Sequence, residues 1–147
     1  MFCEISQETL VSFSGEDASV FLHNQLSCDV AGLAPGKSSY GSYCTPKGRM
    51  LASFLLWRSE QGFFMQLPSS LREPIQKRLT KFILRSKVKV TDISGDWKLI
   101  GVAGQDAHAL VQRAVGQAPN AVHEVTHTPD AIVIRLPGER FEIVAAR

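Results

Sequence analysis

The sequence predicts an α+β fold of mostly antiparallel sheets with helices packed on them, and three observations support this prediction. Short β-prone runs separated by turn residues outnumber the helical stretches, which favours strands that turn back on one another. One long stretch, 71–85, has the apolar spacing of an amphipathic helix. A strand, a glycine corner and a helix that starts after acidic residues occur twice, 89 residues apart. This recurrence indicates an internally duplicated unit.

The first unit is expected to open with a strand over 10–14 and a helix after Gly15. The apolar residues of this helix recur at three- and four-residue spacing, at Ala18, Phe21, Leu22 and Leu26. Three strands follow, over 40–43, 50–57 and 63–67. They are joined by turns at 45–49 and 60–62. The helix 71–85, capped by Ser69 or Ser70, and an alternating strand over 87–93 complete the unit.

The second unit repeats this order. Leu10-x4-Gly15-x-Asp17-Ala18 recurs as Leu99-x4-Gly104-x-Asp106-Ala107. The expected strands 131–136 and 141–144, with their turn, match the earlier hairpin 50–67. We therefore expect a first unit over 1–95 and a partial second unit over 96–147, truncated before its last helix and strand. The alternatives are a chance match, because Gly-x-Asp-Ala is a common helix opening, and a repeat that was always short.

Length and composition indicate one ordinary globular domain. The 147 residues are 44% hydrophobic and 20% charged, and no apolar run reaches the length that a membrane span needs. The N-terminus lacks the basic and then apolar segment of an export signal. Three widely spaced cysteines without a C-x-x-C pattern indicate reduced thiols. We expect a cytoplasmic protein with no membrane partner.

Basic residues are concentrated in one part of the chain. Residues 72–89 hold seven basic residues and one acid, whereas the rest holds nine basic and thirteen acidic residues. Lys77, Lys81 and Arg85 follow one another at four-residue spacing along the expected helix. This stripe is either a polyanion patch that contacts phosphates, as of RNA, or the solvated face of a helix. The second interpretation is preferred, because no aromatic residue is interleaved with the stripe.

His123-Glu124-Val125-Thr126-His127 matches the H-E-x-x-H pattern of zinc hydrolases, which requires a helix. Nearby prolines and β-branched residues favour a surface strand instead, on which the two imidazoles would lie about 13 Å apart. No metal is therefore expected. No activated-nucleophile motif and no phosphate-binding glycine loop occurs. We assign no catalytic residue. Lys47-Gly48-Arg49 forms an expected hairpin tip that is either solvated or faces a ligand.

The chain resembles the YgfZ-type folate-binding proteins, relatives of the glycine-cleavage T-protein (aminomethyltransferase). The resemblance rests on segments in the family's order and spacing: Val11-Ser12-Phe13-Ser14-Gly15-Glu16-Asp17-Ala18, Phe21 to Val30, Tyr40 to Met50, Arg72-Glu73-Pro74, Ser86-Lys87-Val88, Gly101-Val102-Ala103-Gly104 and Glu139 to Val144. It implies an internally duplicated folate-binding fold, with this chain as its N-terminal part. It also implies tetrahydrofolate as the cofactor, with Tyr40, Lys47, Gly48, Arg49 and Arg72 as folate-binding residues.

The same resemblance implies a parent protein that maintains iron–sulfur enzymes and acts in tRNA modification, with folate, tRNA and iron–sulfur enzymes as partners. The family's Lys-Gly-Cys segment does not occur here. Ala52 and Ser53 stand where T-proteins have an acidic pair, and their catalytic aspartate would fall near Pro74. We therefore expect folate binding without turnover. The alternatives are a retained aminomethyltransferase and a tRNA-contacting module that uses residues 71–89.

Overall fold

The computed structural model describes residues 1–147, whose strands form two five-stranded antiparallel sheets. In order across the first sheet lie β3 (Ser38–Cys44), β4 (Met50–Ser59), β5 (Gly62–Pro68), β2 (Glu8–Ser14) and β6 (Lys89–Asp92). In order across the second lie β8 (Val125–His127), β9 (Ala131–Leu136), β10 (Arg140–Ala146), β7 (Trp97–Ala103) and β1 (Phe2–Glu4). The predicted α+β class is confirmed.

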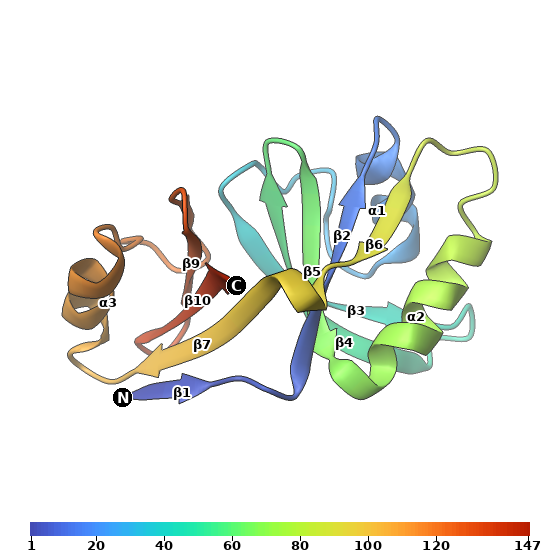
Figure 1. The fold of residues 1–147 in the computed structure, drawn as a ribbon. Helices are drawn as coiled ribbons and strands as arrows, with labels where there is room; N and C mark the ends of the chain where they lie inside the picture. Colours follow the sequence, from blue (N-terminus) through green and yellow to red (C-terminus); the bar gives the residue numbers. More distant parts are fainter.

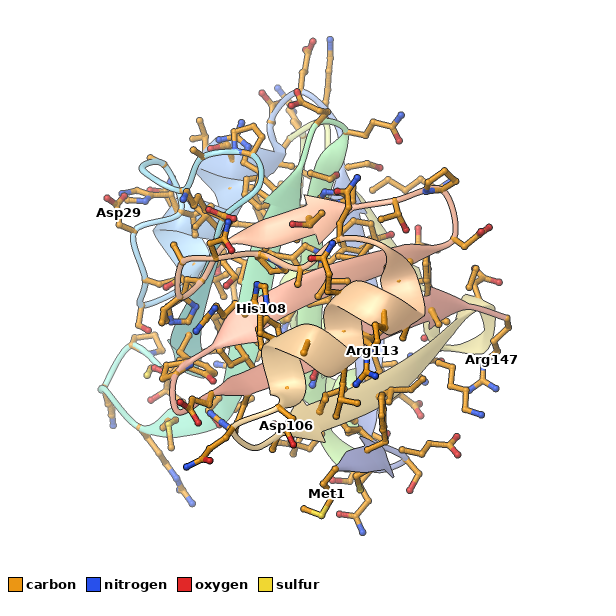
Figure 2. The ribbon with its side chains drawn as sticks, turned by 90° about the vertical axis from the view of Figure 1, so that its left-hand side faces the viewer. Met1, Asp29, Asp106, His108, Arg113 and Arg147 are labelled. Carbon is orange, nitrogen blue, oxygen red and sulfur yellow. The ribbon has the colours of Figure 1, made fainter.

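The helices cover the outer faces of the sheets (Figure 1). Helices α1 (Ala18–Gln25) and α2 (Ser69–Lys81) bury apolar side chains against β2, β4 and β5. Helix α3 (Ala107–Val115) packs on the second sheet, and Figure 2 looks onto this helix with Asp106 at its start. The inner faces of both sheets share a third apolar cluster that includes Trp57 and Ile134. Successive side chains along a strand point to opposite faces of its sheet. One row therefore faces the helices, and the other faces the second sheet.

Four strands of each sheet have the same order, β3-β4-β5-β2 in the first and β8-β9-β10-β7 in the second. In the first, β5 lies between its hairpin partner β4 and β2, and in the second, β10 lies between β9 and β7. The glycine corners match as well: Gly15 has φ +115° and Gly104 has φ +116°, and each precedes a helix by three residues. Arg58 lies over Phe63 at 5.0 Å, and Arg135 lies over Phe141 at 5.2 Å, on equivalent strand pairs. The expected duplication therefore extends to side-chain contacts.

The two repeats meet at a reciprocal pair of backbone hydrogen bonds beside Lys37 and Glu124, which form a bridge. The Ser38 amide donates to the His123 carbonyl at 2.8 Å, and the Val125 amide donates to the Gly36 carbonyl at 2.8 Å. These four residues form two equivalent pairs, because Ser38 and Val125 open equivalent strands. The repeats are thus related by an approximate twofold arrangement.

The second unit differs from the first at one edge. Residues 97–146 contain no counterpart of α2. The edge position that β6 takes beside β2 is taken in the second sheet by β1, which pairs antiparallel with β7. The N-terminal strand thus pairs with the second sheet, although its residues fall within the first unit expected over 1–95. The boundaries 1–95 and 96–147 remain a proposal.

Several expected elements have different limits in the structure. Helix α2 ends at Lys81 rather than Arg85, because the chain tightens into three-residue hydrogen bonds and Leu84 turns to φ +52°. Neither Ser69 nor Ser70 caps this helix; its N-cap is Pro68, with no side-chain cap bond. Strand β1 was not predicted, because its three residues are all exposed and show no alternation. The cysteines are unpaired, and no helix has the length and apolar character needed to cross a membrane.

Candidate functional site

A cavity of about 610 Å³ opens between the two sheets. Its walls come from both repeats: β1, β7 and β10 on one side and β2, β3, β4 and β5 on the other. Ten of its eighteen lining residues are hydrophobic, which is typical of a site for a small organic molecule with a few polar groups. The duplicated architecture therefore builds the cavity at the junction of its two halves.

Three polar atoms of this cavity share one chemical property. Glu8 Oε2, Gln66 Oε1 and Glu142 Oε2 are all buried, and none has a hydrogen-bond partner. Gln66 Oε1 is an acceptor, and the two carboxyl oxygens are acceptors when Glu8 and Glu142 are ionised. Leaving a buried acceptor unpaired costs about 1–3 kcal/mol of folding free energy, so three such atoms in one cavity are unusual. The cavity therefore presents hydrogen-bond acceptors that no group of the protein satisfies.

Glu142 is the most deeply buried of these side chains, with only 3% of its surface exposed. It lies at the centre of the second sheet, opposite Gly101 on β7 and Ile134 on β9. The pKa of its carboxyl is raised to about 7, mainly by burial; the hydrogen bond with Gln66 acts against this shift, the nearby Glu8 adds to it, and the charge of Arg140 acts against it. Burial also raises the pKa of Glu8. Burial thus favours the neutral form of both carboxyls.

The rim of the cavity is formed by Tyr40 on β3 and Arg140 on β10. An Arg140 Nη2 hydrogen donates to the Tyr40 hydroxyl at 3.3 Å, so the rim joins the two repeats. Tyr40 is 47% exposed, which leaves part of its ring free to cover a ligand. The cavity thus has an acidic floor and a rim with an aromatic ring and a cation.

The sequence-predicted folate residues lie in three places. Tyr40 lines the cavity. Arg72 lines an adjoining hollow that shares Ile5 and Glu8 with the cavity, and its Nε atom lies 3.3 Å from an Asp92 carboxylate oxygen. Lys47, Gly48 and Arg49 do not line the cavity; they form the turn between β3 and β4, where Gly48 has the expected positive φ of +83°.

The polyanion patch is exposed along its whole length. Lys77 and Lys81 lie on α2, and Arg85 follows the end of the helix. None of the three side chains has an acidic partner within ion-pair distance. These cations therefore lie in solvent and outside the cavity.

The strand expected over the H-E-x-x-H residues 123–127 forms only in part. Strand β8 begins only at Val125, because His123 lies in a turn with φ +68°. Burial lowers the pKa of His127, with Glu60 acting against the shift, and the His123 ring bonds to Ser38. No group of three or more His, Cys, Asp or Glu side chains is placed to hold a metal ion.

Sequence reasoning missed Glu142, Gln66 and Arg140 as cavity residues. One signal could have found Glu142: it is an isolated acid within the apolar run 141–145 of β10. It faces inward with Val144, so the strand's alternation buries it. Gln66 and Arg140 carry no comparable signal, because their roles depend on how the sheets pack.

The fold and this cavity define a duplicated α+β protein with a cavity between its halves. The sequence matches the family described as the GCVT N-terminal domain over residues 1–133. The chain therefore belongs to that family.

Two of its relatives are proteins named tRNA-modifying protein YgfZ. The one from Sodalis glossinidius is 32% identical over 137 residues, which cover 92% of this chain and 42% of the relative. The one from Blochmanniella pennsylvanica is 30% identical over 149 residues, covering 97% of this chain and 44% of the relative. The chain thus spans less than half the length of these relatives, and its resemblance to the YgfZ-type proteins is confirmed.

Two solved structures share the fold. Aminomethyltransferase T of the glycine cleavage system from Bartonella henselae superposes with a TM-score of 0.87 at 22% identity, over 98% of this chain and 41% of that one. The heterotetrameric sarcosine oxidase from Corynebacterium sp. U-96 gives a TM-score of 0.65 at 15% identity, over 99% and 75%. These likenesses show a common fold.

Proposed function

We propose that the cavity between the sheets binds a reduced folate. The observation that carries this proposal is the group of three buried acceptors without partners: Glu8, Gln66 and Glu142. The 2-amino-4-oxo edge of a tetrahydropterin presents a ring N–H beside an amino group, so it offers adjacent donors in one plane. A carboxylate accepts two such parallel bonds well. Glu142, central and deeply buried, is the proposed partner of this edge.

The remaining parts of the ligand match the remaining parts of the cavity. The flat pterin would lie between apolar walls, with the half-exposed Tyr40 ring covering it at the rim. The anionic glutamate tail would leave past Arg140, and Arg72 in the adjoining hollow could meet a longer tail. Lys47, Gly48 and Arg49 stay a weaker part of the proposal, because their turn lies off the cavity.

We propose binding without turnover for this chain. Ala52 and Ser53 offer no acid at the positions where the resembling T-proteins have one, and Glu73 is exposed on α2. The parent protein would act in iron–sulfur enzyme maintenance and tRNA modification in the cytoplasm. A retained aminomethyltransferase is the alternative, and transfer of a one-carbon unit from an aminomethyl donor to tetrahydrofolate would establish it.

The experiment is calorimetric titration of (6S)-5-formyl-tetrahydrofolate into the chain, with the 2-desamino analogue as the matched control ligand. Saturable binding with one site is expected for the folate, and strongly weakened binding for the analogue, which lacks one of the paired donors. Tyr40→Ala should also weaken folate binding, because the cavity loses its aromatic cover. Equal binding of both ligands, or none of the folate, would overturn the proposal.

A second candidate function is contact with tRNA through Lys77, Lys81 and Arg85. It is favoured by the exposure of all three side chains without acidic partners and by the name of the relatives as tRNA-modifying proteins. Such contacts would be to phosphates and hence independent of base sequence. The two functions use separate surfaces and do not exclude one another.

A further inference from the structure

His123 has a left-handed backbone where the other repeat has a glycine. Its φ is +68°, and that of Gly36, the equivalent residue, is +82°. The equivalence is set by matching hydrogen bonds: the His123 amide donates to the Arg135 carbonyl at 2.7 Å, and the Gly36 amide donates to the Arg58 carbonyl at 2.9 Å. Glycine enters this conformation freely, whereas a residue with a Cβ atom does so at a cost. The backbone conformation of this turn therefore does not require a histidine.

The side chain of His123 makes two contacts, both to β3. Its Nδ1 atom lies 2.8 Å from the Ser38 hydroxyl oxygen. Its ring meets the Tyr40 ring edge to face, with centroids 5.2 Å apart and planes at 83°. Ser38 and Tyr40 are two residues apart on one strand, so their side chains lie on the same face. The buried Ser38 thus fixes the imidazole, and the imidazole fixes one side of Tyr40.

Tyr40 needs such a support. It lies on β3, an edge strand of its sheet, and nearly half of its surface is exposed. The hydroxyl of Tyr40 accepts a 3.3 Å hydrogen bond from Arg140, an exposed residue of the opposite repeat. Without the imidazole, the ring would lose its aromatic contact and keep only the one hydrogen bond at its hydroxyl. The side chain would then be free to leave the cavity rim.

We propose that His123 is a positioning residue, which holds the Tyr40 ring over the cavity at the expense of backbone strain. The inference rests on the proposed function, because the ligand that Tyr40 would cover is the folate. Strained non-glycine residues persist where the strain serves function rather than stability. The equivalent Gly36 shows that the turn forms without a side chain at this position.

The test is His123→Gly, with three measurements. Urea unfolding gives the change in stability, in which the strain released is set against the lost contacts of the imidazole with Ser38 and Tyr40. Carbon-13 relaxation of the Tyr40 ring should show increased motion. Affinity for 5-formyl-tetrahydrofolate should fall about three- to tenfold, which corresponds to ordering one side chain on binding. The variant His123→Asn, which tolerates the left-handed backbone but lacks the ring, should lose affinity to the same extent.

A double-mutant cycle locates the effect. In the Tyr40→Ala background, His123→Gly should leave the affinity unchanged, because there is no ring left to position. A lower unfolding midpoint with unchanged affinity would overturn the inference and make His123 a structural residue. If the wild type binds no folate, the proposed function fails, and the carbon-13 relaxation of the Tyr40 ring becomes the only test of the positioning role. Increased ring motion would then support the positioning role, and unchanged motion would overturn it.

Discussion

Phe64 and Glu142 occupy equivalent positions in the two repeats. Phe64 lies between Ser12 and Trp57 on the neighbouring strands, and Glu142 lies between Gly101 and Ile134. In the first repeat the position holds an aromatic ring that stacks on Trp57 at 5.5 Å. The fold is therefore satisfied by an apolar residue here, and the buried carboxyl of Glu142 needs another explanation. Ligand binding supplies one.

Stability should fall with rising pH because of Glu142. Its pKa is raised from an ordinary 4.5 to about 7, so between these values the folded state keeps a proton that the unfolded chain has lost. The contribution of this carboxyl is thus intact below pH 4.5 and is lost as the pH rises to 7, by up to about 3 kcal/mol. Urea unfolding at pH 5 and pH 8 should show that Glu142→Gln reduces this dependence. An identical pH dependence in the variant would contradict the assignment.

Ligand affinity should change with pH in the opposite direction. The ionised Glu142 carboxylate accepts two hydrogen bonds from the pterin edge, and the protonated carboxyl does not. With a pKa of about 7, the ionised fraction rises steeply between pH 6 and pH 8. Affinity for 5-formyl-tetrahydrofolate should therefore rise about tenfold over this range. Calorimetry in buffers of different ionisation enthalpy should detect the released proton at pH 7, and a flat profile would speak against ionised Glu142 as the partner.

The two glycine corners provide a matched pair of substitutions. A Cβ atom at Gly15 would lie 2.1 Å from the Lys87 carbonyl oxygen, whereas at Gly104 it would meet nothing within 4 Å. Both residues have a strongly positive φ. Gly104→Ala should cost about 1–2 kcal/mol from backbone strain alone. Gly15→Ala should cost about 3 kcal/mol or more, because the clash adds to the strain. Chemical denaturation gives both values, and equal losses would refute the packing of Gly15 against Lys87.

Neutralising part of the polyanion patch tests the tRNA function. The double variant Lys77→Ala/Lys81→Ala should bind tRNA more weakly than the wild type, and the slope of log affinity against log salt should decrease by about 1.5. The matched control is Lys98→Ala/Arg113→Ala, which removes two cations from the second unit; Arg113 lies on α3 (Figure 2). Equal slopes for both double variants would indicate diffuse attraction rather than contact at the patch.

Local sequence signals were sufficient for most of the fold. The Gly15 and Gly104 corners and the apolar spacing of α1 and α2 depend on neighbouring residues, so they could be predicted. Strand β1 could not, because its pairing with β7 joins residues about a hundred positions apart. The end of α2 depends on the left-handed Leu84, which propensity does not foresee.

The site was less predictable than the fold. Tyr40 was identified through a family resemblance and does line the cavity. Glu142 and Arg140 were not identified, because a carboxyl and a guanidinium gain their roles only when the second sheet faces the first. Arg72 was expected beside the ligand, and it lies in the adjoining hollow, paired with Asp92.

The most direct measurement of the central claim is a calorimetric comparison at pH 8 of the wild type and Glu142→Gln, each titrated with (6S)-5-formyl-tetrahydrofolate. Glu60→Gln, a change in the exposed turn between β4 and β5, is the control for a lost carboxylate. We predict a loss of about 2–3 kcal/mol for Glu142→Gln, which is about 30- to 150-fold in affinity, because a charged acceptor of two bonds is replaced by a neutral amide. The control should bind like the wild type. Wild-type affinity in Glu142→Gln would contradict the account.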